Sequence, residues 1–166
     1  MLKYVDTEVV FRELPEEISL AINISNCPCG CQGCHSSYLA GDIGVPLNVK
    51  ELDRLIEKNK GITAICIMGG DNSPADVNAF AAYIKSFYNL KVGWYSGRPT
   101  ISEYIDGRYF DYIKIGPYIP KYGPLDDPNT NQRMYKVTVA DGHIVYNDIT
   151  SVFHYNPIIN RIIATM

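Results

Sequence analysis

The sequence has no excess of positive charge. Its 166 residues include 15 lysines and arginines against 18 aspartates and glutamates, which gives a formal net charge of −3. This charge balance provides little electrostatic attraction for nucleic acid or for an anionic membrane surface. The composition therefore predicts small molecules or other proteins as partners, and no nucleic acid.

Long apolar runs are missing as well. The first 17 residues contain Lys3, Asp6, Arg12 and Glu13 without an apolar stretch, so they do not resemble a secretory signal. Elsewhere no run approaches the roughly 18 consecutive apolar residues typical of a membrane-spanning helix. We therefore expect a cytoplasmic protein with no membrane partner.

The sequence also has no internal repeat, low-complexity tract or charged linker. Its length is typical of one compact domain, and a hydrophobic content of 46% is enough to build a core. We expect a single domain over residues 1–166, in which residues 1–17 form an N-terminal extension. Residues 117–133 contain four prolines, which predict a stiff, functional loop.

Short β-rich runs alternate with helical patterns along the chain. The apolar stripe of Leu52, Leu55 and Ile56 follows a possible cap, Asn48, and indicates one helix. Apolar residues three and four positions apart indicate a second helix between residues 77 and 87, and a shorter helix is expected over residues 102–107. The runs predicted to form strands are residues 18–25, 62–68, 90–96, 111–116 and 134–139.

The order of these elements predicts the fold class. Strands joined by helices imply parallel pairing with right-handed crossovers. A complete eight-fold barrel needs about 250 residues, so this chain is too short to close one. The sequence therefore predicts an α/β fold, an open partial (β/α) barrel with a mainly parallel sheet, in which the cysteine loop follows the first core strand.

Four of the five cysteines fall within eight positions, in the run NCPCGCQGCHSS at residues 26–37. Cytosolic thiols stay reduced, so metal binding is favoured over disulfides. Cys27, Cys31 and Cys34 have the spacing C-x3-C-x2-C, which lets one short loop wrap an iron–sulfur cluster. Three ligands would leave one iron of a four-iron cluster open to a substrate or cofactor, as in catalytic zinc sites that lack a ligand.

A structural zinc site that uses all four sulfurs is the alternative. Zinc sites commonly combine two separated cysteine pairs, and this sequence has no second pair, so the spacing favours the cluster. Cys29 is then a bystander thiol, or a ligand that replaces another when the cofactor is absent or the cluster is damaged. Cys66 lies within an apolar run and is expected in the core.

The cysteine spacing and its position after a strand resemble the radical S-adenosylmethionine superfamily. The run IMGGDNSP at residues 67–74 is similar to the superfamily's Gly-Gly-acid motif. The resemblance implies that a 4Fe-4S cluster reductively cleaves S-adenosyl-L-methionine to a 5′-deoxyadenosyl radical. The cluster ligands it implies are Cys27, Cys31 and Cys34, and the residues it implies for binding the methionine end of the cofactor are Gly69, Gly70 and Asp71.

Four further residues are candidates for contact with the cofactor. Gly33 allows the loop to turn tightly beside the bound group. His35 lies where the family's backbone passes the cofactor, although an exposed loop histidine is an equal alternative for its side chain. Ser96, together with Arg98, would reach the ribose or carboxylate of the cofactor, or else would only cap the next turn.

Longer stretches resemble one family within the superfamily, the activating enzymes of anaerobic (class III) ribonucleotide reductase. These stretches are residues 92–105, 111–119 and 123–137, and Gly33 immediately before the third cluster cysteine agrees with them. The resemblance implies an enzyme that forms a glycyl radical on the large subunit of the reductase, with a reduced flavodoxin-like or ferredoxin-like electron donor. The run Asn131-Gln132-Arg133 is specific to the family, but its contacts are left open.

Other functions are compatible with the same motifs. The chain could activate a different glycyl-radical enzyme, or act as a radical S-adenosylmethionine enzyme on a small molecule. A non-catalytic iron–sulfur or zinc module is an alternative from another class. Metal content and turnover of S-adenosylmethionine separate this module from the enzymes.

Overall fold

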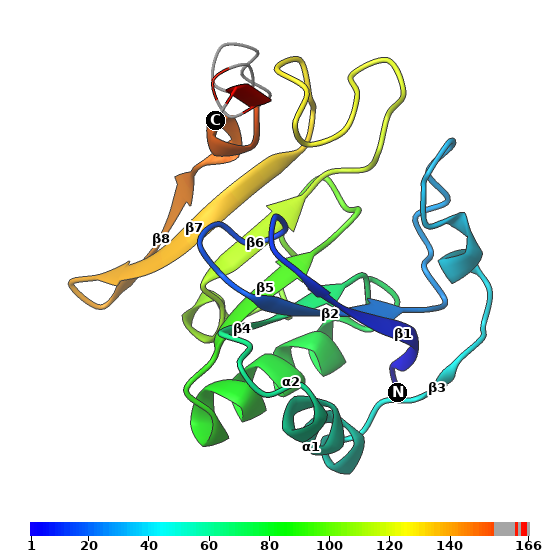
Figure 1. The fold of residues 1–166 in the computed structure, drawn as a ribbon, viewed down its shortest axis with the longest axis vertical. Helices are drawn as coiled ribbons and strands as arrows, with labels where there is room; N and C mark the ends of the chain where they lie inside the picture. The colour runs from blue at the N-terminus through cyan, green and yellow to red at the C-terminus, as the bar shows by residue number, and fades with distance from the viewer. Residues whose placement is uncertain (155–161, 163, 166) are drawn as a thin grey trace.

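The computed structural model describes residues 1–154, 162, 164 and 165, and the rest of the predicted domain lies outside the described residues. Its centre is one eight-stranded sheet with the strand order β3-β1-β2-β4-β5-β6-β7-β8 (Figure 1). The strands are β1 (Lys3–Val10), β2 (Ser19–Ile24), β3 (Val45–Pro46), β4 (Ala64–Met68), β5 (Lys91–Tyr95), β6 (Tyr112–Ile115), β7 (Arg133–Ala140) and β8 (His143–Asp148).

The sheet is mixed, so the predicted fold class is wrong. Strands β2, β4, β5 and β6 are parallel, whereas the β3–β1, β1–β2, β6–β7 and β7–β8 pairs are antiparallel. The described residues contain two α-helices, α1 (Val49–Lys58) and α2 (Pro74–Phe87). A mostly β structure with hairpins at both edges replaces the α/β, open partial (β/α) barrel with its mainly parallel sheet.

Both α-helices cover the same face of the sheet (Figure 1). Helix α1 begins where Asn48 Oδ1 accepts a hydrogen bond from Glu51 N at 2.9 Å, the expected N-cap. Its buried stripe is the predicted one of Leu52, Leu55 and Ile56. Helix α2 begins at Pro74, whose fixed φ suits the first helical turn.

The helix expected over residues 102–107 does not form. The chain turns there instead and forms only a short 3₁₀ segment, η2 (Gly107–Tyr109). Side chains compete for the backbone donors that a helix needs: Ser102 Oγ accepts from Tyr104 N, and Asp106 Oδ1 accepts from Arg108 N. The two other 3₁₀ segments are η1 (Ser37–Ala40) and η3 (Thr150–Phe153).

The opposite face of the sheet is covered by loops. Leu14, in the turn between β1 and β2, is fully buried there against Gly93 of β5, where a Cβ would lie 2.4 Å from a Leu14 methyl carbon. Cys66 is buried in the same cluster. The hydroxyl of Tyr95 fixes this turn to the sheet by donating a hydrogen bond to Glu13 O at 2.6 Å.

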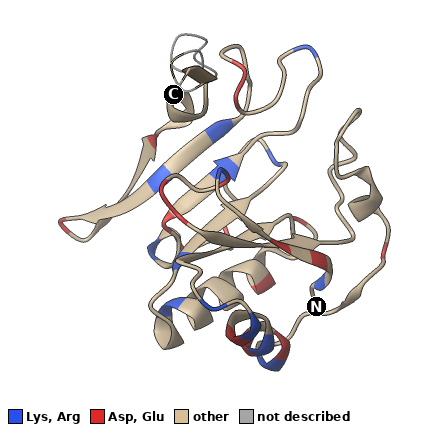
Figure 2. Ribbon diagram, in the orientation of Figure 1, with Lys and Arg blue, Asp and Glu red and all other residues tan. Residues whose placement is uncertain are grey.

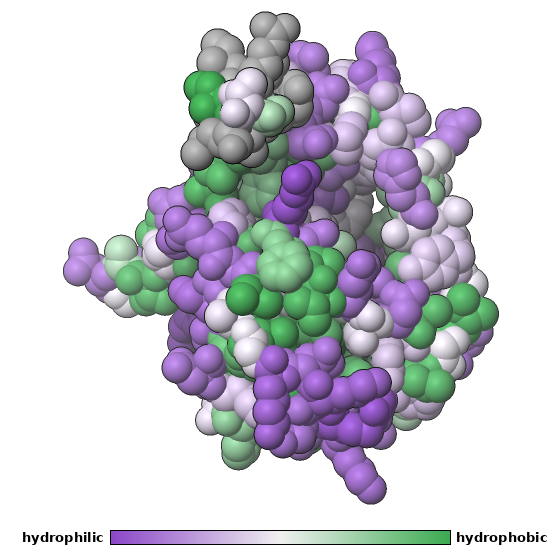
Figure 3. All heavy atoms as spheres, in the orientation of Figure 1, coloured by the Kyte–Doolittle hydropathy of each residue, from purple (hydrophilic) through white to green (hydrophobic). Residues whose placement is uncertain are grey.

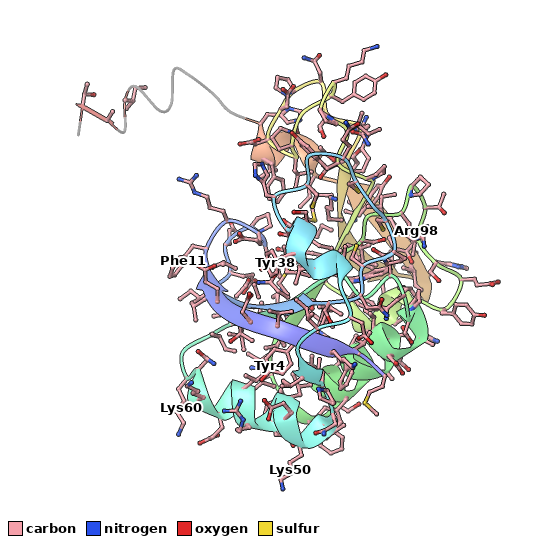
Figure 4. The ribbon with its side chains drawn as sticks, turned by 90° about the vertical axis from the view of Figure 1, so that its right-hand side faces the viewer. Tyr4, Phe11, Tyr38, Lys50, Lys60 and Arg98 are labelled. Carbon is pink, nitrogen blue, oxygen red and sulfur yellow. The ribbon has the colours of Figure 1, made fainter. Side chains whose placement is uncertain are left out.

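The outer surface differs between the hairpin and the helices. Hydrophobic atoms gather over the β1–β2 hairpin in the centre of Figure 3, and Phe11 at its turn is 68% exposed and points outward in Figure 4. Helix α1 carries charges of both signs side by side (Figure 2). The Arg54–Glu51 pair on α1 is partly exposed and the Lys60–Glu57 pair at its C-terminal end is exposed, so both add little stability.

Replacing Leu14 by alanine should destabilise the protein. Truncating a buried leucine typically costs about 3 kcal/mol, because the lost methyl groups leave a cavity. The free energy of unfolding of Leu14→Ala, measured in urea, should fall by about that amount, while the exposed Phe11→Ala serves as the control and should change it little. Equal stability of the Leu14 variant and the unmodified protein would show that the turn does not close this face.

Candidate functional site

The four clustered cysteines lie in the loop that follows β2. The loop is closed at its base, because Asn26 N donates to Gly41 O and Cys27 N donates to Leu39 O, each at 2.9 Å. Leu39 is buried and anchors η1 beneath the loop. Tyr38 in η1 donates to Asp6 Oδ2 at 3.1 Å, and Figure 4 shows it near β1 in front of the sheet.

One row of residues across the sheet forms the floor of a cavity beside this loop. Asn23, Met68, Tyr95 and Lys114 are register neighbours on β2, β4, β5 and β6. All four line a cavity of about 160 Å³. It lies at the carboxyl ends of the parallel strands, where ligands bind in open sheets of this kind.

The cavity brings the predicted cluster ligands together with three of the predicted cofactor residues, Gly69, Asp71 and Ser96. Its other lining residues include Cys27, Cys29, Cys31, Cys34, Gly69, Asp71, Ser96 and Gly97. Gly33, His35 and Gly70 are not among its lining residues. The ring of His35 lies 6.0 Å from the ring of Tyr118 in the proline-rich loop, measured between centroids.

Asp71 is a buried carboxylate held by three donors. It is 8% exposed, and it follows the Gly69-Gly70 turn at the end of β4. Ser96 Oγ donates to its Oδ1 at 2.5 Å, and Gly97 N donates to its Oδ2 at 2.9 Å. The thiol of Cys29 is the third donor, with Sγ 3.5 Å from Oδ2.

The turn before Asp71 requires glycine. Gly69 and Gly70 have φ angles of +96° and +92°, which side chains with a Cβ rarely adopt. A Cβ on Gly70 would also lie 2.6 Å from Val77 Cγ2, so helix α2 packs directly on this turn. Gly69 O accepts a hydrogen bond from the indole of Trp94 at 2.8 Å, which fixes the turn to β5.

Ser96 has the capping role, one of the two roles expected for it. Its hydroxyl oxygen accepts from Arg98 N at 3.0 Å, which caps the turn after β5, while its proton goes to Asp71. Figure 4 places Arg98 on the far side of the cysteine loop from Phe11. Ser96 therefore positions Asp71 as well as lining the cavity.

Lys114 is a cavity residue that the sequence reasoning missed. Its side chain is 8% exposed, and its ammonium donates to Gly116 O at 2.7 Å and to Ser96 O at 3.3 Å. Burial lowers the pKa of Lys114 to about 8, while the cavity thiols and Asp71 oppose this effect. In the sequence, a lysine inside the run YIKI looks like an ordinary outward-facing residue of a strand. Only the register of the sheet reveals that it faces a cavity.

The Asn131-Gln132-Arg133 run holds the proline-rich loop at its base. Asn131 Nδ2 donates to Pro117 O at 3.0 Å, and Arg133 Nη1 donates to Gln132 O at 2.7 Å. Gln132 is buried, and its Cα would lie 3.0 Å from a Cβ on Gly116. These contacts give the run a structural role in the loop.

The loop sulfurs do not form a closed cage. Within the described residues, no three histidine, cysteine, aspartate or glutamate side chains converge closely enough to hold one metal ion. The four thiols instead face a shared cavity. A separate hollow of about 830 Å³ along α1 is larger, but charged side chains make up most of its lining, and no thiol borders it.

Comparison with protein-family models finds no match to this chain, and neither curated proteins nor solved structures yield one. Among the described residues, no helix is both long and apolar enough to cross a membrane. The function therefore has to be argued from the residues of the cavity.

Two of the thiols are electrostatically linked. A hydrogen bond from the Cys29 thiol lowers the pKa of Cys27 to about 6, and the same pairing, with burial, raises the pKa of Cys29. The pair therefore carries one negative charge at neutral pH, on Cys27. This thiolate is the form that binds metals and reacts with electrophiles.

Cys27 should therefore be the most readily alkylated cysteine of the metal-free protein at low pH. A lowered pKa means that the thiolate forms as the pH rises through about 6 rather than through the ordinary range near 9. Iodoacetamide labelling mapped by mass spectrometry should show this early rise at Cys27. In Cys29→Ala the rise should move to higher pH, and an unchanged profile would contradict the hydrogen bond.

Proposed function

We propose that this chain is a radical S-adenosylmethionine enzyme that forms a glycyl radical on the large subunit of an anaerobic ribonucleotide reductase. We place it in the cytosol, where thiols stay reduced, with a reduced flavodoxin-like or ferredoxin-like protein as its electron donor. The observation that carries the proposal is that three suitably spaced cysteines and a buried carboxylate border one cavity.

The thiols of the cavity fit an iron–sulfur cluster. Cys27, Cys31 and Cys34 all border the cavity, and soft thiolates are the ligands that such clusters take. When bound, the cluster would supply the electron that cleaves the sulfonium C–S bond of S-adenosylmethionine. The proposal rests on this donor set and not on the fold class, which differs from the expected one.

The polar residues of the cavity match the methionine end of the cofactor. Asp71 offers a carboxylate to an ammonium group, and Ser96 fixes its orientation. Lys114 offers a buried positive charge to a carboxylate on the same floor. Opposite charges on either side of β5, from the turn after β4 and from β6, therefore suit a zwitterionic amino acid group.

A second hollow suits a polypeptide substrate. It measures about 350 Å³ and shares Met68 and Tyr95 with the cysteine cavity. Its remaining walls come from Arg12 and Glu13 of the β1–β2 turn and from residues 124–126 of the proline-rich loop, with Phe153. A narrow, glycine-bearing loop of a partner would reach the cavity by this route.

The decisive experiment is anaerobic incubation of the reconstituted protein with its candidate partners. With S-adenosylmethionine and a strong reductant, electron paramagnetic resonance should detect a glycyl radical on the reductase. A radical on another glycyl enzyme and none on the reductase would change the assigned partner. Protein that binds only zinc, or that never releases 5′-deoxyadenosine and methionine, would refute the catalytic function.

Single substitutions should separate the four loop cysteines. Cys27→Ala, Cys31→Ala and Cys34→Ala should each abolish cleavage of S-adenosylmethionine, because each removes a cluster ligand. Cys29→Ala should retain most of the cleavage, and the buried Cys66→Ala is a control for loss of a thiol outside the loop. Iron content and 5′-deoxyadenosine release are the measurements, and an inactive Cys29 variant would contradict the three-ligand assignment.

Lys114→Met should weaken cofactor binding without removing the cluster. Loss of one charge-assisted hydrogen bond costs roughly 1.5–3 kcal/mol, so the Kd should rise on the order of 10- to 100-fold. Calorimetric titration of the loaded protein with S-adenosylmethionine measures this change. Lys121→Met, in the exposed part of the proline-rich loop, is the matched control, and equal Kd values for both variants would exclude a cofactor contact at Lys114.

A further inference from the structure

Cys29 lies beside Cys27 and also reaches the end of β5. Its Sγ lies 3.5 Å from Asp71 Oδ2. A Cβ on Gly97 would be only 2.7 Å from the same sulfur, so the absence of a side chain at Gly97 makes room for the thiol. The sulfur therefore fills a defined place in the floor of the cavity.

This place coincides with the one assigned to the cofactor's amino group. Asp71 Oδ1 is bonded to Ser96 and Oδ2 to Gly97 N, and the open side of Oδ2 is taken by Cys29. An ammonium that pairs with Asp71 must approach the same oxygen. Cys29 in this position and a bound methionine group therefore exclude each other.

We propose that Cys29 is the resting ligand of the fourth iron and that S-adenosylmethionine displaces it. The inference rests on the proposed function, in which that iron binds the cofactor's amino and carboxylate groups beside Asp71. A sulfur placed at Asp71 is at the position from which the amino nitrogen would bind. The loop thus offers three permanent thiolate ligands and one exchangeable ligand.

The exchange balances without a change of oxidation state. The iron–sulfur bond to Cys29 breaks, and bonds from the iron to the cofactor's nitrogen and carboxylate oxygen form. The ammonium must lose a proton to bind iron, and the departing Cys29 thiolate takes that proton. Asp71 Oδ2 lies within hydrogen-bond reach of the thiol.

A fourth thiolate would protect the cluster while the cofactor is absent. An iron with three protein ligands exposes its remaining position to water and oxidants, and it is the iron most readily lost. Cys29 is partly exposed and lies in a loop rather than on a strand, and nothing lies within 4 Å of the Cβ position of the next residue, Gly30. The exchange therefore requires movement of only a short piece of loop.

The first test is mild oxidation of the cluster-loaded protein without S-adenosylmethionine. Ferricyanide should convert Cys29→Ala and Cys29→Ser rapidly to the three-iron form, detected by its electron paramagnetic resonance signal and by iron release. The unmodified protein and the Cys66→Ala control should keep four irons under the same treatment. Equal rates of iron loss in the Cys29 variants and in the unmodified protein would overturn the proposal.

The second test is the affinity for the cofactor. Cys29→Ala removes a competitor at Asp71, so its Kd for S-adenosylmethionine, from calorimetry, should fall by about tenfold, which corresponds to about 1.4 kcal/mol. An unchanged or higher Kd would contradict displacement. If the unmodified protein assembles no four-iron cluster, the proposed function itself fails. If it assembles the cluster and cleaves the cofactor while both tests on Cys29 are negative, only this inference fails.

Discussion

The carboxylate of Asp71 is the point on which the cavity depends. It draws together the turn after β4, the end of β5 and the loop after β2, because its hydrogen-bond donors are Ser96, Gly97 N and Cys29. Burying a carboxylate is costly unless such donors compensate for the lost water. The strand ends must therefore keep their relative positions for the fold to tolerate this residue.

The register of the parallel strands determines what faces this carboxylate. Side chains alternate between the two faces of a strand, so the row of Asn23, Met68, Tyr95 and Lys114 lies entirely on the face opposite the helices. A shift of one residue in any strand would turn its member of the row into the helical core. The antiparallel hairpins at the edges extend the sheet, but the four parallel strands alone provide the floor.

The sequence predicts local features better than their pairing. The cap at Asn48 and the core strands are readable because they depend on nearby residues, and the clustering of the cysteines is visible directly. The edge strands are not readable in this way. Strand β1 carries the charged residues Lys3, Asp6 and Glu8, and β8 is almost wholly exposed, so neither has the apolar pattern of a core strand. Without these edge strands the sequence predicts a mainly parallel barrel. Without the register, Lys114 cannot be recognised as a cavity residue.

The position of Cys29 follows from the order of cysteines and glycines in the loop. One residue separates it from both Cys27 and Cys31, and Gly30 with a φ of +58° lets the chain reverse between Cys29 and Cys31. The reversal sends one sulfur to Asp71, where Gly97 leaves space for it. Three thiols are enough to hold a cluster with one open iron, so a fourth thiol directed at the acidic group of the cavity has its clearest use at that open position. In the proposed function, occupation of this position by Cys29 would couple cofactor binding to release of the thiol from the iron.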